Sequence, residues 1–147
     1  MERVNNSRVR HLEDDEFARV LDDCPEWLKP IGVVARYTGI RRSNLLGLKW
    51  RQLDLPRQLI LLEHTKNGDR LSVPMCQTVV DVFKTLGKVR HLHSDAVFSG
   101  PDGVVPSEFI VSMTFVRVCR RAGIWEFRFH DHRHTFVSTI VQRGVDL

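Results

Sequence analysis

The stretch that decides how this chain is interpreted lies near its C-terminus and reads, over residues 129–135, Phe129-His130-Asp131-His132-Arg133-His134-Thr135. His130 and Arg133 are three residues apart, a spacing that places two side chains on one face of a helical turn. One phosphate group can then meet an imidazole and a guanidinium together. A planar guanidinium pairs with two phosphate oxygens and keeps its charge. We therefore expect these two residues to belong to a site that handles phosphate.

Two upstream stretches carry further cations, Tyr37-Thr38-Gly39-Ile40-Arg41 and His64-Thr65-Lys66-Asn67-Gly68. Arg41 follows a glycine that ends an apolar helix, so its side chain can leave the core. Lys66 stands beside an Asn-Gly pair, which is a strong signal for a two-residue hairpin turn. A lysine at such a tip is flexible, and it can donate a proton when nearby charges move its pKa.

The order and spacing of these three segments resemble the catalytic domain of the tyrosine recombinases, the phage integrase family. The resemblance runs from about Arg10 to Leu147 and includes packing residues between the motifs, among them Leu45–Trp50, Val73-Pro74 and Val97-Phe98. It implies cleavage of one DNA strand by a tyrosine, a 3′-phosphotyrosyl link, and religation to a different strand. That reaction needs no nucleotide, metal or other cofactor.

The resemblance also assigns roles to the cations. Lys66 would protonate the leaving 5′ oxygen, and His130 would handle the proton of the nucleophile. The catalytic set would then be Arg41, Lys66, His130 and Arg133. The expected contacts to DNA phosphates are Arg41, Arg42, Lys66, Arg133 and His134.

Three departures from the family pattern affect this interpretation. Asn44 stands where an acidic residue usually braces the first arginine, so it is either a neutral support for Arg41 or a helix cap. His132 occupies a position that is usually apolar. The family's nucleophilic tyrosine has no counterpart before Leu147, because Tyr37 is the single tyrosine and lies on an apolar helix. We expect a recombinase fragment, truncated before its nucleophile and inactive alone, since losing a nucleophile can cost about 10⁶ in rate.

Charge and composition agree with a DNA partner. The net charge is +4, with −3 over residues 1–35 and +7 over residues 36–147, where the proposed site lies. A basic surface favours contact with the phosphate backbone. No apolar run approaches the roughly 18 residues of a membrane span, and three scattered cysteines favour reduced thiols. We expect double-stranded DNA and other recombinase subunits as partners, no membrane contact, and a cytoplasmic protein of bacterial, phage or mobile-element origin.

The hydrophobic pattern predicts an α+β fold, mainly helical with a small three-stranded antiparallel sheet. It indicates a flexible arm over residues 1–11 and a single, incomplete catalytic domain over residues 12–147. Helices are expected at 12–21, from near Pro25 to Gly39, at 45–50 behind a Ser43 or Asn44 cap, and at 79–86, 107–121 and 133–142. Strands are expected at 59–62, 71–73 and 96–98.

Two other functions fit parts of the sequence. A non-catalytic DNA-binding remnant or decoy of a recombinase would use the same arginines without the chemical step. A metal-dependent hydrolase would use the alternating histidines at 130, 132 and 134, with His91 and His93 as a further pair. In a helix, however, side chains two residues apart point about 200° apart and cannot share one ion.

Overall fold

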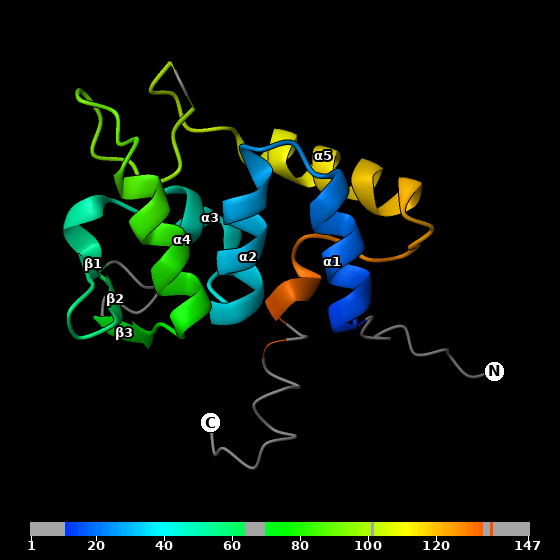
Figure 1. Ribbon diagram of the computed structural model, residues 1–147, viewed down its shortest axis with the longest axis horizontal. Helices are drawn as coiled ribbons and strands as arrows, with labels where there is room; N and C mark the ends of the chain where they lie inside the picture. Colours follow the sequence, from blue (N-terminus) through cyan, green and yellow to red (C-terminus); the bar gives the residue numbers. More distant parts are fainter. Residues whose placement is uncertain (1–10, 64–69, 101, 134–135, 137–147) are drawn as a thin grey trace, which may run out of the picture.

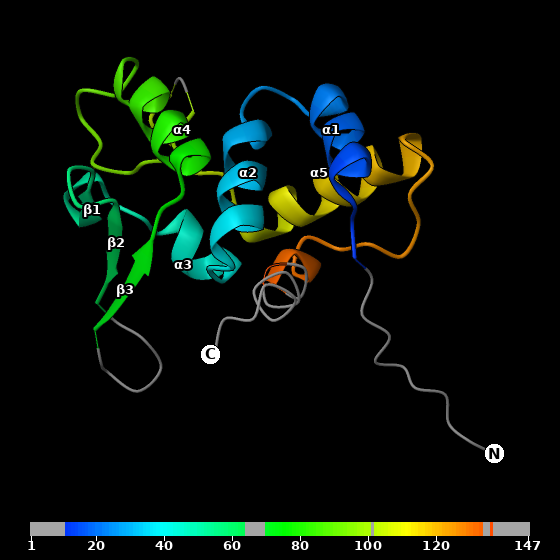
Figure 2. The same cartoon turned by 60° about the horizontal axis from the view of Figure 1, so that its bottom comes forward.

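The computed structural model of the chain describes residues 11–63, 70–100, 102–133 and 136. These residues form helices α1 to α5, a further helical segment at residues 131–133 and 136, one short 3₁₀ turn and a three-stranded antiparallel sheet, so the predicted α+β fold is confirmed. Helix α2 lies between α1 and α4, the sheet lies beside α4, and α5 crosses behind α2 and α1 (Figures 1 and 2). Among the helices so described, none is both long enough and apolar enough to cross a membrane.

Helix α1 spans Asp14–Asp23, two residues later than the sequence predicted. Leu12 precedes it and is fully buried, which explains why the apolar pattern suggested an earlier start. Glu13 is the N-cap of the helix, and its backbone N–H donates to the side chain of Glu16 at 3.0 Å in a capping box. The correction therefore has a physical cause, because an acidic cap sets the first turn.

Helix α2 spans Leu28–Thr38 and ends at Gly39, as predicted. Its expected start near Pro25 is wrong, since Pro25 accepts a hydrogen bond from the backbone N–H of Leu28 within a turn that precedes the helix. Most of the helix is buried, so α2 forms the centre of the core.

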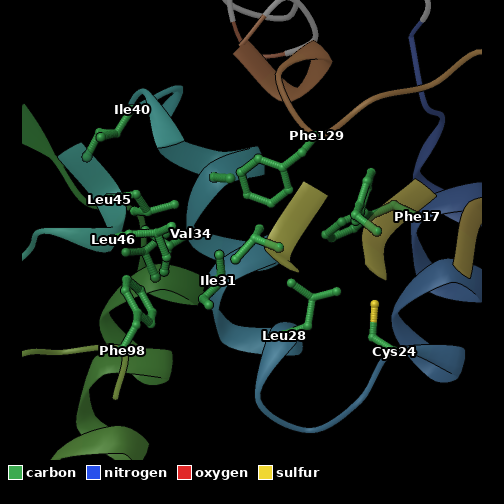
Figure 3. Packing of buried hydrophobic residues seen from close by; sticks show 14 of the residues in the cluster. Phe17, Cys24, Leu28, Ile31, Val34, Ile40, Leu45, Leu46, Phe98 and Phe129 are labelled. Atoms are coloured by element: carbon green, nitrogen blue, oxygen red, sulfur yellow. The ribbon is translucent and has the colours of Figure 1, made fainter. Parts of the chain in front are cut away.

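The core runs continuously from α1 through α2 to α3, which spans Arg42–Leu46 (Figure 3). Phe17 packs at the α1 end, while Leu45 and Phe98 pack at the other end. The helix predicted at 45–50 is corrected here: α3 begins at Arg42, and Trp50–Gln52 forms the separate 3₁₀ turn η1.

The sheet consists of β1 (Leu53–Asp54), β2 (Leu59–Leu62) and β3 (Leu71–Pro74), in that order. Ile60 pairs with Leu53 on one side and with Val73 on the other, and its side chain is fully buried. The two predicted strands at 59–62 and 71–73 are thus confirmed.

The third strand was predicted wrongly at 96–98. Ala96 forms only an isolated bridge to Lys49, and the backbone N–H of Val97 donates to the carbonyl of Leu48 at 3.0 Å. Those apolar residues are buried because they pack against the core, and strand β1 takes the place in the sheet instead.

Helices α4 (Gln77–Gly87) and α5 (Glu108–Arg121) lie close to their predicted positions. The Ser107 hydroxyl caps α5 by accepting from the backbone N–H of Ile110 at 3.1 Å. Residues 1–10 of the expected arm, the Asn67-Gly68 turn and most of the expected helix at 133–142 lie outside the described residues.

Candidate functional site

A tightly built turn at the end of α2 carries Arg41. The buried Thr38 hydroxyl donates to the carbonyl of Val34 at 2.7 Å and accepts from the backbone N–H of Ile40 at 3.3 Å. Gly39 adopts a left-handed conformation with φ +69°, which costs a glycine little. Ile40 is buried, so the chain is fixed on both sides of the glycine before it reaches Arg41.

Arg41 itself occupies the N-cap position of α3, and its carbonyl accepts from the backbone N–H of Leu45 at 2.9 Å. Its side chain is exposed, as the sequence predicted. A rigid backbone therefore presents this guanidinium to solvent at the end of the central helix.

Arg133 lies in a second compact turn, over residues 128–133. The backbone N–H of Arg128 donates to Asp131 Oδ2 at 2.8 Å, and the N–H of Arg133 donates to the carbonyl of His130 at 3.1 Å. These bonds begin a helix at Asp131, so the side chains of His130 and Arg133 are separated by one helical turn.

The structure brings Arg41 and Arg133 within electrostatic range of each other. Burial and, second, the nearby positive charge of Arg41 lower the pKa of Arg133 from its ordinary value. Arg133 is half-buried, and the turn that carries it lies beside the C-terminal end of α2 (Figures 1 and 2). Two guanidinium groups held close together attract an anion that can lie between them.

His130 is exposed and borders an open pocket of about 580 Å³ between α5 and residues 124–130. Arg42, Arg120 and Arg128 also line this pocket. The guanidinium of Arg120 lies over the Trp125 ring, 5.7 Å from its centroid. No sequence motif marks Arg120 or Arg128; the position of Arg128 two residues before His130 is the available signal.

Arg42, expected to contact DNA, is held by α5. It donates to Glu108 Oε1 from Nε at 3.0 Å and from Nη2 at 2.8 Å, and it also contacts the Ser112 hydroxyl. Its guanidinium borders the pocket and has an anionic partner in Glu108.

The remaining site predictions have mixed outcomes. Asn44 is a half-buried residue inside α3, so its predicted role as the cap is wrong and the N-cap position belongs to Arg41. Whether Asn44 supports Arg41 stays a prediction. Lys66 and His134 lie outside the described residues.

The packing around His132 explains how a histidine is accommodated at this buried position. Its side chain is 1% exposed, and its ring lies 5.1–5.6 Å, centroid to centroid, from four phenylalanines. Neither ring nitrogen has a hydrogen-bond partner among the described residues. Burial, and then the positive charge of Arg36, lower its pKa to about 3, so the ring is neutral. His132 thus fills the apolar position that the family pattern expects.

This packing bears on the metal hypothesis. His130 is exposed whereas His132 is buried, so the two imidazoles lie in opposite surroundings. The described part of the chain holds no group of three or more histidine, cysteine or carboxylate residues arranged to bind a metal ion. The His91 and His93 rings do lie near each other, with centroids 6.0 Å apart, but they are not part of such a group.

Tyr37 is 37% exposed, and its ring contacts Phe17 edge-on, with ring centroids 6.4 Å apart. It lies on α2, one turn before Arg41.

Comparison with known proteins agrees with this geometry. The model of the phage integrase family matches residues 10–147. The integrase of Salmonella phage P22 is 36% identical over 155 residues, which cover 97% of this chain and 39% of that protein. The chain therefore spans well under half the length of that relative.

Solved structures share the fold. The crystal structure of XerA recombinase matches with a TM-score of 0.82 at 23% identity, over 99% of this chain and 54% of that one. A lambda integrase dimer bound to a COC′ core site matches with a TM-score of 0.75 at 19% identity, over 93% of this chain and 54% of that one. Because the family model covers residues 10–147, nearly the whole chain, this chain belongs to the phage integrase family of tyrosine recombinases.

Proposed function

We propose that this chain is the phosphate-binding part of a site-specific DNA recombinase and that Arg41 and Arg133 bind the same backbone phosphate of double-stranded DNA. The observation that carries the proposal is the position of the turn of residues 128–133 beside the C-terminal end of α2 (Figures 1 and 2), where the charge of Arg41 is the second cause, after burial, that lowers the pKa of Arg133. Two like charges this close repel each other, and a phosphate between them relieves that repulsion.

The basic pocket beside His130 supports a path for the duplex. From the arginine pair, the DNA backbone would continue across Arg128 and Arg120, with the exposed ring of Trp125 beneath Arg120. The lambda integrase structure of the same fold is a dimer bound to a core site, which supports DNA as the ligand and further subunits as partners. Such a protein would work in the cytoplasm of a bacterial cell.

In the strand-cleavage reaction, each proposed residue has one task. The two guanidinium groups would stabilise the charge that develops on the phosphate oxygens. His130 would accept the proton of the attacking hydroxyl, and Lys66 would protonate the leaving 5′ oxygen. We propose that residues 1–147 bind DNA without cleaving it: Tyr37 is their single tyrosine, it lies on α2, and its ring contacts Phe17 edge-on.

Binding is tested with a short fluorescent duplex titrated at several salt concentrations. Arg41→Ala and Arg133→Ala should each weaken binding by roughly ten-fold or more, because a hydrogen bond to a charged group contributes about 1.5–3 kcal/mol. Each should also reduce the slope of log affinity against log salt by about 0.9, since one phosphate contact is lost. His130→Ala should change affinity little, because its task belongs to the chemical step.

Arg90→Ala is the matched control. It removes the same charge from a residue that follows the C-terminal end of α4, pairs with Asp95 at 3.0 Å and does not line the pocket beside His130. Unchanged affinity in both Arg41→Ala and Arg133→Ala would overturn the proposal. The absence of cleavage is checked by looking for a covalent protein–DNA adduct on a denaturing gel; an adduct that Tyr37→Phe abolishes would refute that part.

A further inference from the structure

The ring of Phe136 lies directly against Gly39. A Cβ atom built on Gly39 would fall 2.6 Å from Cδ2 of Phe136 and 3.0 Å from its Cγ, closer than real Cβ atoms approach other atoms. No side chain larger than hydrogen fits there unless the ring moves. This contact joins the turn at the end of α2 to the helical segment that begins at Asp131.

Each side of this contact is tied to one of the two arginines. Gly39 lies two residues before Arg41, in the turn that Thr38 and the buried Ile40 hold rigid. Phe136 and Arg133 are both helical and three residues apart, so they lie on neighbouring positions of one helix face. A shift of the Phe136 ring would therefore move Arg133 relative to Arg41.

Something must hold the two guanidinium groups together before DNA arrives. Like charges repel, and the charge of Arg41 is the second cause, after burial, that lowers the pKa of Arg133; this repulsion opposes the close approach of the two segments. An apolar contact between the segments opposes that repulsion without adding a charge that would compete for phosphate.

We propose that Phe136 is a positioning residue whose ring, seated on Gly39, sets the spacing of Arg41 and Arg133 so that one phosphate can engage both. The inference rests on the proposed function, because it assumes that the two arginines share a phosphate. Phe136 itself does not touch DNA. Its effect is expected in the cooperation between the arginines rather than in the contact that either makes alone.

The test is a double-mutant cycle for duplex DNA binding. Affinities are measured for the parent chain, Arg41→Ala, Arg133→Ala and the double variant, first with Phe136 and then with Phe136→Leu. With Phe136 intact, the two losses should be non-additive, because removing either arginine disrupts a shared contact. In the Phe136→Leu background, the two losses in binding free energy should become additive. The Phe136→Leu single variant, with both arginines present, should bind DNA roughly ten-fold more weakly than the parent chain.

Phe98→Leu controls for a general loss of core stability. It makes the same change in a buried residue that packs against Phe83 on the opposite side of the core from Phe129 (Figure 3). This variant should lower thermal stability and leave the coupling between the arginines intact.

A second pair of variants approaches the contact from its other side. Gly39→Ala keeps the Phe136 ring but forces it to move, and it also strains a backbone with φ +69°. Gly123→Ala carries the same kind of strain at φ +79°, but no atom lies within 4 Å of its new Cβ. Only Gly39→Ala should abolish the coupling.

The outcomes separate the two proposals. If Arg41→Ala and Arg133→Ala leave affinity unchanged while Phe136 is present, the proposed function fails. If both weaken binding but their coupling survives in Phe136→Leu and Gly39→Ala, the positioning role is overturned while the phosphate site stands. Loss of coupling in Phe98→Leu or Gly123→Ala would also overturn it, because any destabilisation would then have the same effect.

Discussion

The His132 ring meets the Phe115 ring at an angle of 60°, with the two centroids 5.1 Å apart, deep inside the protein. His132 immediately precedes Arg133, so the position of Arg133 depends on how the His132 imidazole packs. Phe17, Phe127 and Phe129 surround it edge-on. A polar ring with two unpaired nitrogens thus occupies an apolar cage among the described residues.

Replacing this imidazole by a hydrocarbon should stabilise the protein. A buried polar group without a partner costs about 1–3 kcal/mol, and leucine is close to histidine in volume. We expect His132→Leu to raise the free energy of unfolding at pH 7 by about 1 kcal/mol, measured by urea denaturation. A loss of stability would show that the ring nitrogens have partners in solution.

Acid should destabilise the protein through the same residue. The folded-state pKa of His132 is lowered to about 3, whereas the unfolded chain has the ordinary value near 6.5. The unfolded state therefore binds one more proton than the folded state between these values, and stability falls as pH drops through this window. At pH 5 the loss from this residue should be about 2 kcal/mol.

The comparison with His132→Leu isolates that contribution from the many carboxylates. The stability gap between the variant and the parent should widen by about 2 kcal/mol from pH 7 to pH 5. His93→Asn, at an exposed position, should show no such widening. A constant gap for His132→Leu would mean that the ring is solvated enough to titrate in the folded protein.

Thr38 should contribute to stability through its hydroxyl rather than through its shape. Thr38→Val is nearly isosteric, but it removes the donor to the Val34 carbonyl and leaves the backbone N–H of Ile40 without its acceptor. We expect a loss of about 1–3 kcal/mol in the free energy of unfolding. Thr38→Ser keeps both hydrogen bonds and should lose less; equal losses would mean that the hydroxyl contributes nothing.

The end of α2, the start of α5 and strands β2 and β3 were predicted well from the sequence, because their signals are local. Gly39 ends α2, Ser107 caps α5, and strands β2 and β3 follow a short apolar run and a turn signal that span only a few residues. The three corrected starts, at α1, α2 and α3, also involve local choices, but competing signals stood within two or three residues of each other.

What the sequence could not provide depends on contacts between distant segments. The cage around His132 takes Phe127 and Phe129 from the neighbouring sequence but Phe17 and Phe115 from α1 and α5, so the local sequence cannot reveal that the cage closes. The pairing of Arg42 with Glu108 joins residues 66 positions apart. Likewise, Ala96 looked like a strand because buried apolar residues give the same pattern whether or not they join a sheet.

The ion pair between Arg42 and Glu108 leads to a prediction about DNA affinity. Arg42 borders the basic pocket but is neutralised by Glu108 at 2.8 Å. Glu108→Gln should release the guanidinium and remove a negative charge next to the proposed duplex path. We expect tighter binding to a short duplex at low salt, by roughly 2- to 10-fold, because such half-exposed pairs contribute about 1 kcal/mol or less.

Asp95→Asn is the control that matches this change. Asp95 pairs with Arg51 and Arg90 at 3.0 Å, away from the pocket, so its neutralisation frees two arginines and removes one negative charge elsewhere. If affinity responds only to net charge, both variants should bind more tightly by similar factors. If Arg42 becomes a phosphate contact, only Glu108→Gln should gain affinity, and that gain should vanish when Arg42→Ala is added. Unchanged affinity in Glu108→Gln would leave Arg42 as a brace between α3 and α5, and the expected phosphate contact at this position would be wrong.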